Sequence, residues 1–252
     1  MRSDRLEALK KYILENETVS IHNLCDKFKI SRNTLRRDLT ELEECGCLTK
    51  IYGGVSAIHQ ADFIPVTERS MCNKAAKELI GKLAAQLVED GDTIFIDSGT
   101  TALNIIPNLF DKKNITIITL SMAVLSMVTK YREFQIMAVG GQYNPDTSSF
   151  FGPETIVALE GLHIVKAFIG CSGVTVESGI TNMTYYEPIL KNKVIERSRK
   201  VILVSDTSKM GYNATRSVCP LNKVHMLVSE KQPPMDIINY CNQFGIKIVY
   251  GE

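Results

Sequence analysis

Apolar residues recur at helical spacing in three consecutive segments near the N-terminus, and this pattern predicts three short amphipathic helices. Ser20 and Ser31 stand directly before the second and third segments, a position where serine caps a helix. Three such helices can enclose a small common core. The apolar positions are Leu6, Leu9, Ile13 and Leu14 in the first segment, Ile21, Leu24, Cys25 and Phe28 in the second, and Leu35, Leu39 and Leu42 in the third, which we expect to end near Gly46.

A short β-ribbon is predicted directly after the third helix. Residues 48–52 form strand-like sequence, and Gly53 and Gly54 follow them. A Gly-Gly pair allows the left-handed backbone that a tight turn needs. A ribbon in this place corresponds to the wing of a winged helix-turn-helix domain, which we predict over residues 1–57.

The pattern changes after the ribbon. Residues 58–72 lack periodicity and contain Pro65, which is typical of a linker. A helix predicted over residues 74–88 then precedes a series of short apolar runs, most of them separated by helix-like stretches. Near-continuous β-branched runs predict a mostly parallel sheet covered on both faces, and therefore an α/β domain over residues 73–252. The runs are residues 93–96, 115–118, 136–139, 167–169, 201–204, 226–228 and 246–249.

Charge is distributed unevenly along the chain. The 252 residues, with 44% apolar content, suffice for two cores, and the net charge of +1 excludes a uniformly basic surface. The segment from residue 29 to residue 37 nevertheless contains no acid and four cations, namely Lys29, Arg32, Arg36 and Arg37. A local positive field of this kind favours contact with phosphates.

The outer face of the third helix has the donors that a DNA-reading helix uses. At about 100° per residue, Asn33, Arg37 and Thr40 lie opposite the leucines and Arg36 flanks them. Such side chains can reach base edges or phosphates. Asp38 is expected to pair with an arginine or a helix amide, because a carboxylate facing phosphate would be repelled. DNA is therefore the first partner that the sequence predicts.

Small polar residues follow several of the apolar runs. Proteins with parallel sheets bind ligands beyond the carboxyl ends of the strands. These residues therefore predict a ligand site at that edge of the sheet. Glycine and hydroxyl residues at a helix start offer amides to an anion, so a small polyol phosphate is the expected ligand. Lys209 would supply a cation for the phosphate. Asp97 and Asp206 would accept hydrogen bonds from the ligand's hydroxyl groups, and Gly99 would let the backbone approach the ligand closely. The candidate residues are Asp97, Ser98, Gly99, Thr100, Thr101, Gly140, Gly141, Asp206 and Lys209.

Cysteines and histidines show no arrangement typical of a metal site. The seven cysteines form no CxxC pair and the four histidines are far apart in the sequence. Neither a signal peptide nor an apolar run of membrane length is apparent. We expect no metal, no cofactor and no membrane association, and a location in the reducing cytoplasm.

These patterns resemble one known family. Residues 31–39, with Ser31, Thr34, Arg36, Arg37, Asp38 and Leu39, together with Leu42, Gly46 and the Tyr52-Gly53-Gly54 turn, look like the N-terminal signature of the DeoR family of bacterial transcriptional regulators. By this resemblance the DNA-facing residues are Ser31, Arg32, Asn33, Thr34, Arg36 and Arg37, and we add Lys50 on the predicted wing.

The resemblance extends over nearly the whole chain. The stretches DGDTIFIDSGTT, SSFFGP, GITN and ILVSDTSKMG, and residues 187–191, are similar to the family's sensor domain, whose fold resembles sugar-phosphate isomerases. The resemblance adds Glu187 to the effector candidates. It implies a repressor of a carbohydrate-utilisation operon whose sensor binds a phosphorylated sugar, so that operator affinity falls. A dimer or tetramer is expected, since one winged helix has a small footprint.

Two departures from the family pattern bear on the effector. This chain has Thr119-Leu120-Ser121 where the family often has Thr-Asn-Ser, and it has Gln142 after Gly140-Gly141 where the family often has a basic residue.

Two other functions are compatible with parts of the sequence. An isomerase-like enzyme with an accessory DNA-binding domain would use Asp97, Asp206 or Glu187 as a base. A protein-interaction adaptor would use the winged helix as a partner module. DNA binding through phosphates should weaken steeply with salt, whereas an apolar protein interface should not.

Overall fold

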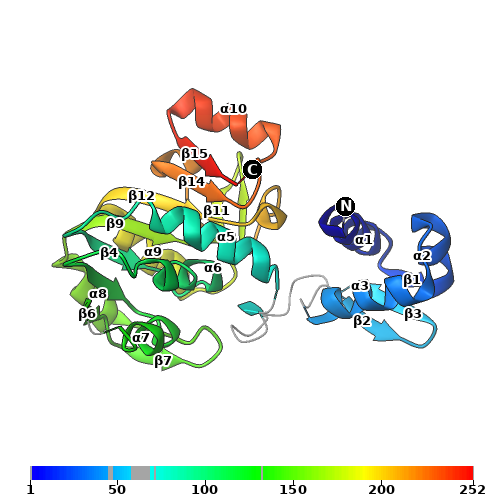
Figure 1. Cartoon of the computed structure of the whole chain (residues 1–252), viewed down its shortest axis with the longest axis horizontal. Coiled ribbons are helices and arrows are strands. Elements are labelled where there is room, and N and C mark those ends of the chain that lie inside the picture. Colours follow the sequence, from blue (N-terminus) through cyan, green and yellow to red (C-terminus); the bar gives the residue numbers. More distant parts are fainter. Residues whose placement is uncertain (1, 45–47, 58–68, 71, 132, 252) are drawn as a thin grey trace. The chain divides into compact units, whose positions relative to one another are not determined.

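The chain divides into two units, Met1–Cys72 and Asn73–Glu252, shown in Figure 1. The computed structural model describes residues 2–44, 48–57, 69–70, 72–131 and 133–251. Most of the predicted linker over residues 58–72 lies outside the described residues, as does Gly46, the predicted end of the third helix.

Up to Ala57, the described part of the N-terminal unit combines three helices with a small sheet. The strands pair in the antiparallel order β1-β3-β2. One core of buried residues, including Leu9, Leu24, Leu35 and Val55, draws on every helix and strand of the unit. This arrangement confirms the predicted winged helix-turn-helix domain. Its elements are α1 (Arg2–Asn16), β1 (Thr18–Ser20), α2 (Ile21–Phe28), α3 (Arg32–Glu44), β2 (Leu48–Ile51) and β3 (Gly54–Ala57).

Serine hydroxyls begin the second and third helices, as predicted. The Ser20 hydroxyl accepts a hydrogen bond from the Asn23 amide at 3.2 Å, and the Ser31 hydroxyl accepts one from the Thr34 amide at 3.2 Å. Between the helices, Lys29 has a left-handed φ of 51° and donates its amide to the carbonyl of Cys25. The turn between α2 and α3 is therefore set by local backbone chemistry.

The chain reverses direction at Tyr52 and Gly53, between the two strands of the wing. The geometry of this turn depends on Gly53 and Gly54. Gly53 has a φ of +74°, which L side chains rarely adopt. Gly54 pairs with Ser20 of β1 on one side and with Ile51 of β2 on the other. A Cβ at Gly54 would lie 2.6 Å from the carbonyl oxygen of Val19, so a larger residue would separate β1 from β3.

A seven-stranded sheet forms the centre of the C-terminal unit. Its strand order is β15-β14-β12-β9-β4-β5-β6, and every neighbouring pair is parallel. All seven predicted apolar runs are strands, although β9 and β12 begin earlier than predicted. The strands are β4 (Thr93–Ile96), β5 (Thr116–Thr119), β6 (Gln135–Ala138), β9 (Ile164–Ile169), β12 (Ser198–Val204), β14 (Met226–Ser229) and β15 (Lys247–Tyr250).

Helices cover both faces of this sheet, as Figure 1 shows. A separate hydrophobic core lies on each face of the sheet. Successive side chains of β4 point to opposite faces, so Ile94 and Ile96 belong to one buried cluster and Phe95 belongs to the other. The first cluster includes residues of α5 (Lys74–Ala85), α6 (Thr100–Leu103) and α7 (Met122–Val128); the second includes residues of α8 (Pro153–Glu160), α9 (Tyr186–Glu196) and α10 (Met235–Phe244).

Helix α5 ends before the predicted boundary at residue 88. The amides of Leu87 and Val88 bond to the carbonyls of Ala84 and Ala85, three residues back, so the chain continues as tighter turns. Helix α6 comprises only four residues and begins at Thr100, earlier than the start near Ala102 that the sequence predicts.

Short elements complete the C-terminal unit. An antiparallel hairpin connects β6 to α8, and a separate three-stranded sheet has the order β10-β11-β13. The apolar runs did not predict these elements, which are β7 (Gln142–Asn144), β8 (Ser149–Phe151), β10 (Gly173–Thr175), β11 (Gly179–Asn182), β13 (Arg216–Cys219), η1 (Ile106–Asn108), η2 (Thr207–Lys209) and η3 (Leu221–Lys223).

The N-terminal core predicts that truncating a buried and an exposed apolar side chain will change the free energy of unfolding by very different amounts. Leu35 is fully buried, so Leu35→Ala should lower the free energy of unfolding by about 2–5 kcal/mol. Ile51 is 43% exposed, and Ile51→Ala should cost under about 1 kcal/mol. Urea unfolding followed by circular dichroism would measure both. Similar losses for the two variants would contradict the described core.

Candidate functional site

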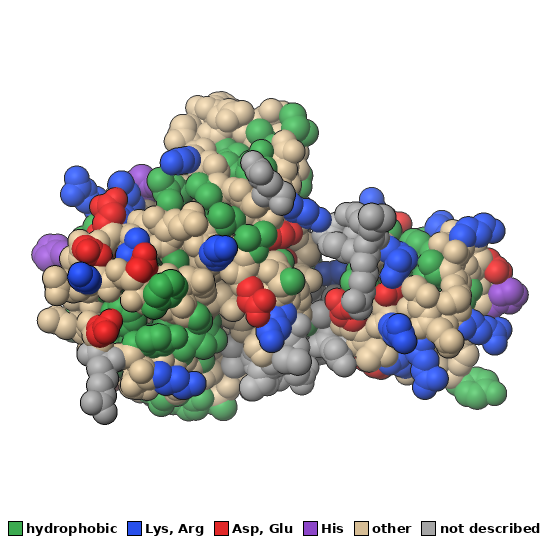
Figure 2. Space-filling model, in the orientation of Figure 1, with side chains coloured by type: hydrophobic (Ala, Val, Ile, Leu, Met, Phe, Trp, Pro, Cys, Tyr) green, Lys and Arg blue, Asp and Glu red, His purple; other side chains and the backbone are tan. Residues whose placement is uncertain are grey.

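The exposed start of α3 is the first candidate site. Ser31 and Thr34 are engaged in the helix cap, since their hydroxyls also lie 3.0 Å apart. The remaining predicted DNA-facing residues of this helix are exposed and form none of the described ion pairs: Arg32, Asn33, Arg36 and Arg37. Figure 2 shows Lys and Arg side chains on the visible face of this unit. Three guanidinium groups on one short helix, with no acidic partner among the residues that the structure describes, can bind an anionic polymer.

Asp38 anchors this helix to α1. Its carboxylate is 1% exposed and accepts two hydrogen bonds from the Arg5 guanidinium, at 2.7 and 3.2 Å. This contact confirms the prediction that Asp38 is a local partner of an arginine. The pair holds α3 in place while its charged side faces solvent.

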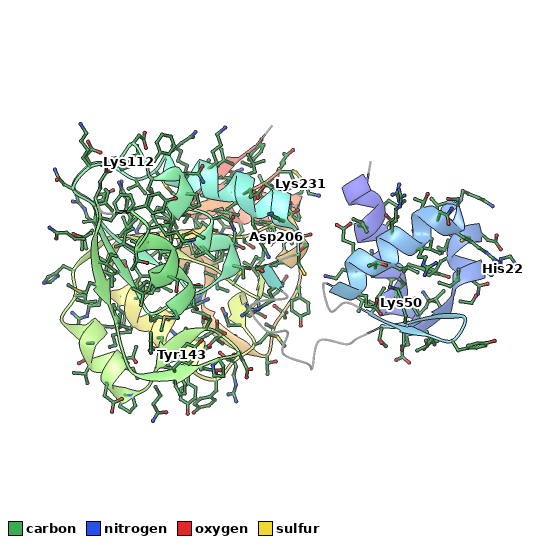
Figure 3. All side chains as sticks on the ribbon, turned by 60° about the horizontal axis from the view of Figure 1, so that its bottom comes forward. His22, Lys50, Lys112, Tyr143, Asp206 and Lys231 are labelled. Carbon is green, nitrogen blue, oxygen red and sulfur yellow. The ribbon has the colours of Figure 1, made fainter. Side chains whose placement is uncertain are left out.

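Lys50 on the wing has a partner within the unit. Its ammonium forms an ion pair with Glu43 and donates to the Thr40 hydroxyl at 3.0 Å. The hydrogen bond from Lys50 lowers the pKa of Glu43 below its ordinary value. Lys50, labelled in Figure 3, therefore links β2 to α3 and has less free charge than the arginines. Tyr52 at the wing tip is fully exposed.

A small cavity at the carboxyl end of the parallel sheet is the second candidate site. Its volume is about 30 Å³. Asp97 and Ser98 enter from the end of β4, and Glu187 enters from α9, so three predicted effector residues line it. The full lining is Phe95, Asp97, Ser98, Leu120, Asn144, Thr147, Ser149, Phe151, Thr184, Tyr186, Glu187, Leu190, Lys191 and Val194.

The buried cation of this cavity is Lys191, which the site prediction did not include. Its ammonium lies 2.9 Å from Asp97 Oδ2 and donates to the Gly170 carbonyl at 2.7 Å and to Asn182 Oδ1 at 3.2 Å. Burial alone would lower the pKa of Lys191, but Asp97 and Glu187 outweigh it and raise the pKa above its ordinary value. The cavity therefore contains an ammonium group that its acidic neighbours keep charged at neutral pH.

The spacing along α9 was the available signal for Lys191. Glu187 and Lys191 are four residues apart, which places them on one face of a helix. The Glu187 carboxylate accepts a hydrogen bond from the Thr184 hydroxyl at 2.7 Å, which orients the first turn of α9 toward the cavity.

The β7–β8 hairpin supplies a wall that the sequence did not predict. Asn144, Thr147 and Ser149 give it polar groups, and the Ser149 hydroxyl donates to Thr147 at 2.8 Å. The Phe151 ring lies 4.4 Å from the Tyr186 ring of α9, measured between centroids. Tyr143 of the same hairpin, labelled in Figure 3, is exposed. The hairpin and α9 thus enclose the cavity together.

Several predicted effector residues do not line this cavity. Gly99, Thr100 and Thr101 form the start of α6, and a single turn of helix offers little dipole to an anion. The Gly140 carbonyl accepts a hydrogen bond from the Thr155 hydroxyl at 2.8 Å. A Cβ at Gly141 would lie 2.2 Å from that hydroxyl, so Gly141 allows the hairpin to approach α8.

Asp206 and Lys209 form a separate cluster beyond β12. Asp206 Oδ1 accepts a hydrogen bond from Asn73 at 3.1 Å, and the Lys209 ammonium lies 3.6 Å from Asp206 Oδ2. Neither residue lines the cavity of Lys191. The predicted site is therefore divided between two neighbouring clusters at the strand ends.

Two other kinds of feature are missing from the residues that the structure describes. Within the described part of the chain, no group of three or more His, Cys, Asp or Glu side chains could hold a metal ion. Among the helices that the structure describes, none has the length and apolar character needed to cross a membrane.

Family models match both units of the chain. The model of the DeoR-like helix-turn-helix domain matches residues 5–61, and that of the DeoR C terminal sensor domain matches residues 72–231.

Similar proteins align over most of their length. The HTH-type transcriptional regulator IolR of Bacillus subtilis is 33% identical over 98% of this chain and 99% of its own. The glycerol-3-phosphate regulon repressor of Escherichia coli is 26% identical over 98% of each chain. The lactose phosphotransferase system repressor of Streptococcus mutans is 31% identical over 92% of this chain and 93% of its own.

Solved structures show a weaker similarity. Ribose 5-phosphate isomerase A of Methanocaldococcus jannaschii is 18% identical over 55% of each chain, with a TM-score of 0.41. That score is too low to bear on function. The two family models and the nearly full-length match to a regulator establish the family. The chain belongs to the DeoR family of transcriptional regulators.

Proposed function

We propose that this regulator represses a carbohydrate-utilisation operon by binding operator DNA through α3 and the wing, and that a phosphorylated sugar in the Lys191 cavity releases it. The exposed arginines of α3, which have no described acidic partner, carry the DNA part of the proposal. The names of two relatives, a glycerol-3-phosphate regulon repressor and a lactose phosphotransferase system repressor, support the carbohydrate part.

On the DNA side, the cap and the arginines have separate roles. Ser31 and Thr34 fix the start of α3, so Arg32, Asn33, Arg36 and Arg37 project from a rigid base. Arginine reads guanine in the major groove or binds phosphate, and asparagine reads adenine. A positive helix start adds a favourable dipole toward phosphate. Lys50 would act mainly by holding the wing against α3.

On the effector side, an anion would compete with Asp97 for Lys191. The hydroxyl and amide groups of Thr147, Ser149 and Asn144 surround the cavity and suit a sugar's hydroxyls. About 30 Å³ holds only one or two water molecules, so a sugar phosphate requires the hairpin or α9 to move. A ligand that binds only a rearranged cavity necessarily shifts the protein toward that arrangement.

We further propose that the regulator acts as a dimer or tetramer in the cytoplasm. One winged helix covers a small stretch of duplex, and paired half-sites are the usual way to reach tight operator binding. The cytoplasmic location follows from the role, because an operator lies on the chromosome.

The family gives the isomerase alternative no support, and one of its three candidate bases, Asp97, is already engaged. Asp97 Oδ2 pairs with the Lys191 ammonium and accepts a hydrogen bond from the Gly170 amide at 2.8 Å, so this oxygen is already engaged. A general base must instead be free to reach a substrate proton. An adaptor without DNA binding would not need the exposed arginines of α3, which form none of the described ion pairs.

The double variant Arg36→Ala plus Arg37→Ala should abolish tight operator binding. Removing an arginine from a base edge costs about 1–3 kcal/mol, and removing two arginines from phosphates would reduce the salt slope by about two. Fluorescence anisotropy at several salt concentrations would measure both quantities. The control, Lys10→Ala plus Lys11→Ala, removes the same charge from α1 and should bind like wild type. Wild-type affinity in the arginine variant would refute the assignment of α3.

Ser98→Ala should weaken the response to effector without weakening DNA binding. Ser98 is buried and lines the cavity, so losing one hydrogen bond to a charged ligand should raise the effector concentration for half-release about tenfold. Operator release by glycerol 3-phosphate, glucose 6-phosphate and fructose 1-phosphate would be titrated for each protein. Ser126→Ala, on the exposed side of α7, is the matched control. Equal titrations for the two variants would place the effector elsewhere.

A further inference from the structure

The first residue of the C-terminal unit makes an unusual contact. Asn73 stands at the N-cap of α5 with a left-handed φ of 51°, yet its side chain does not cap the helix. Its amide instead donates to Asp206 Oδ1 at 3.1 Å and to the Ser208 hydroxyl at 3.0 Å. The side chain that directly follows the N-terminal unit is thus bound to the end of β12. Figure 3 labels Asp206 in this position.

Asp206 is a strong anchor because it is buried and ionised. Its residue is 1% exposed. Burial raises the pKa of Asp206, but Lys209, the Ser208 hydroxyl, Lys77 and Asn73 outweigh burial and hold the pKa below its ordinary value. An amide that donates to a buried carboxylate forms a stronger hydrogen bond than one between neutral groups. The contact therefore ties the exposed Asn73 side chain, at the start of α5, to a buried carboxylate.

A continuous series of contacts joins this anchor to the cavity. Lys191 donates to the Gly170 carbonyl at 2.7 Å, and the Gly170 amide donates to Asp97 at 2.8 Å. The next residue, Cys171, donates its thiol to the Ser205 hydroxyl at 3.3 Å. Ser205 adjoins Asp206 and donates to its carbonyl at 3.2 Å. Every residue in this series is buried. Because a packed interior leaves little free space, a displacement of Lys191 should be passed to its neighbours in the series.

We propose that the contact of Asn73 with Asp206 and Ser208, here named the latch, is the element through which the cavity controls the DNA-binding unit. The inference rests on the proposed function. The closed latch fixes the start of α5, and with it the point from which the chain leads to the winged helix. An anion that draws Lys191 from Asp97 shifts Gly170 and Cys171, displaces Ser205 and Asp206, and opens the latch. The closed state binds the operator and the open state does not.

Asn73→Gly is the sharpest test of the latch. Glycine keeps the left-handed backbone, and the cap loses nothing because the asparagine side chain does not serve it. Asn114→Gly is the matched control, since Asn114 also has a positive φ of 57°, is exposed, and precedes β5 at the opposite end of the sheet. Ser208→Ala removes one partner of Asn73 without altering the backbone, and it serves as a second latch variant.

Operator affinity of the full-length proteins without effector would be measured by anisotropy at several salt concentrations. Asn73→Gly should bind up to about tenfold more weakly, because the loss of one hydrogen bond to a charged group lowers the closed fraction by at most that factor. Ser208→Ala should bind about threefold more weakly, on the order of half that effect. The salt slope should stay at the wild-type value in both, because the DNA-facing arginines are intact. Asn114→Gly should match wild type.

The outcomes separate the two proposals. Wild-type affinity in both latch variants would refute the latch while leaving the repressor assignment in place. A reduced salt slope in Asn73→Gly would also refute it, because that result would mean the DNA contacts themselves had changed. Absence of operator binding by the wild-type protein would refute the proposed function, and the latch with it.

Discussion

The buried ion pair between Lys191 and Asp97 is the constraint on which the organisation of the C-terminal unit depends. Removing two charges from water is costly, and the pair persists because the Gly170 carbonyl, the Gly170 amide and Asn182 complete its hydrogen bonds. These groups tie α9 to the ends of β4 and β9 and to β11. Any anion that enters the cavity must compete with Asp97 for Lys191. Anion binding therefore requires this ion pair to rearrange.

In the proposed function, the two sides of α3 have separate roles, one in folding and the other in DNA contact. Leu35 and Leu39 are buried, Ser31 caps the helix, and the Arg5–Asp38 pair holds it against α1. The remaining face carries the arginines. Because the helix is fixed by its apolar side and its cap, changes to the exposed guanidinium groups can alter DNA affinity without altering the fold.

The sequence predicted elements whose signals are local. The seven apolar runs became the seven strands, and Ser20 and Ser31 became helix caps, because both follow from the residues in one short segment. The cavity was predicted only in part. Its hairpin wall depends on tertiary packing, and the bond between Asn73 and Asp206 joins residues 133 positions apart. No periodicity in the sequence encodes such a contact.

We propose that one chain couples salt-sensitive operator binding to a phosphorylated sugar. The most direct test is the anisotropy of the wild-type protein on DNA upstream of its own operon, at two salt concentrations, with and without each sugar phosphate. We expect tight binding that weakens steeply with salt and is relieved by one sugar phosphate. Binding that is insensitive to salt and to all of the sugar phosphates would contradict this coupling.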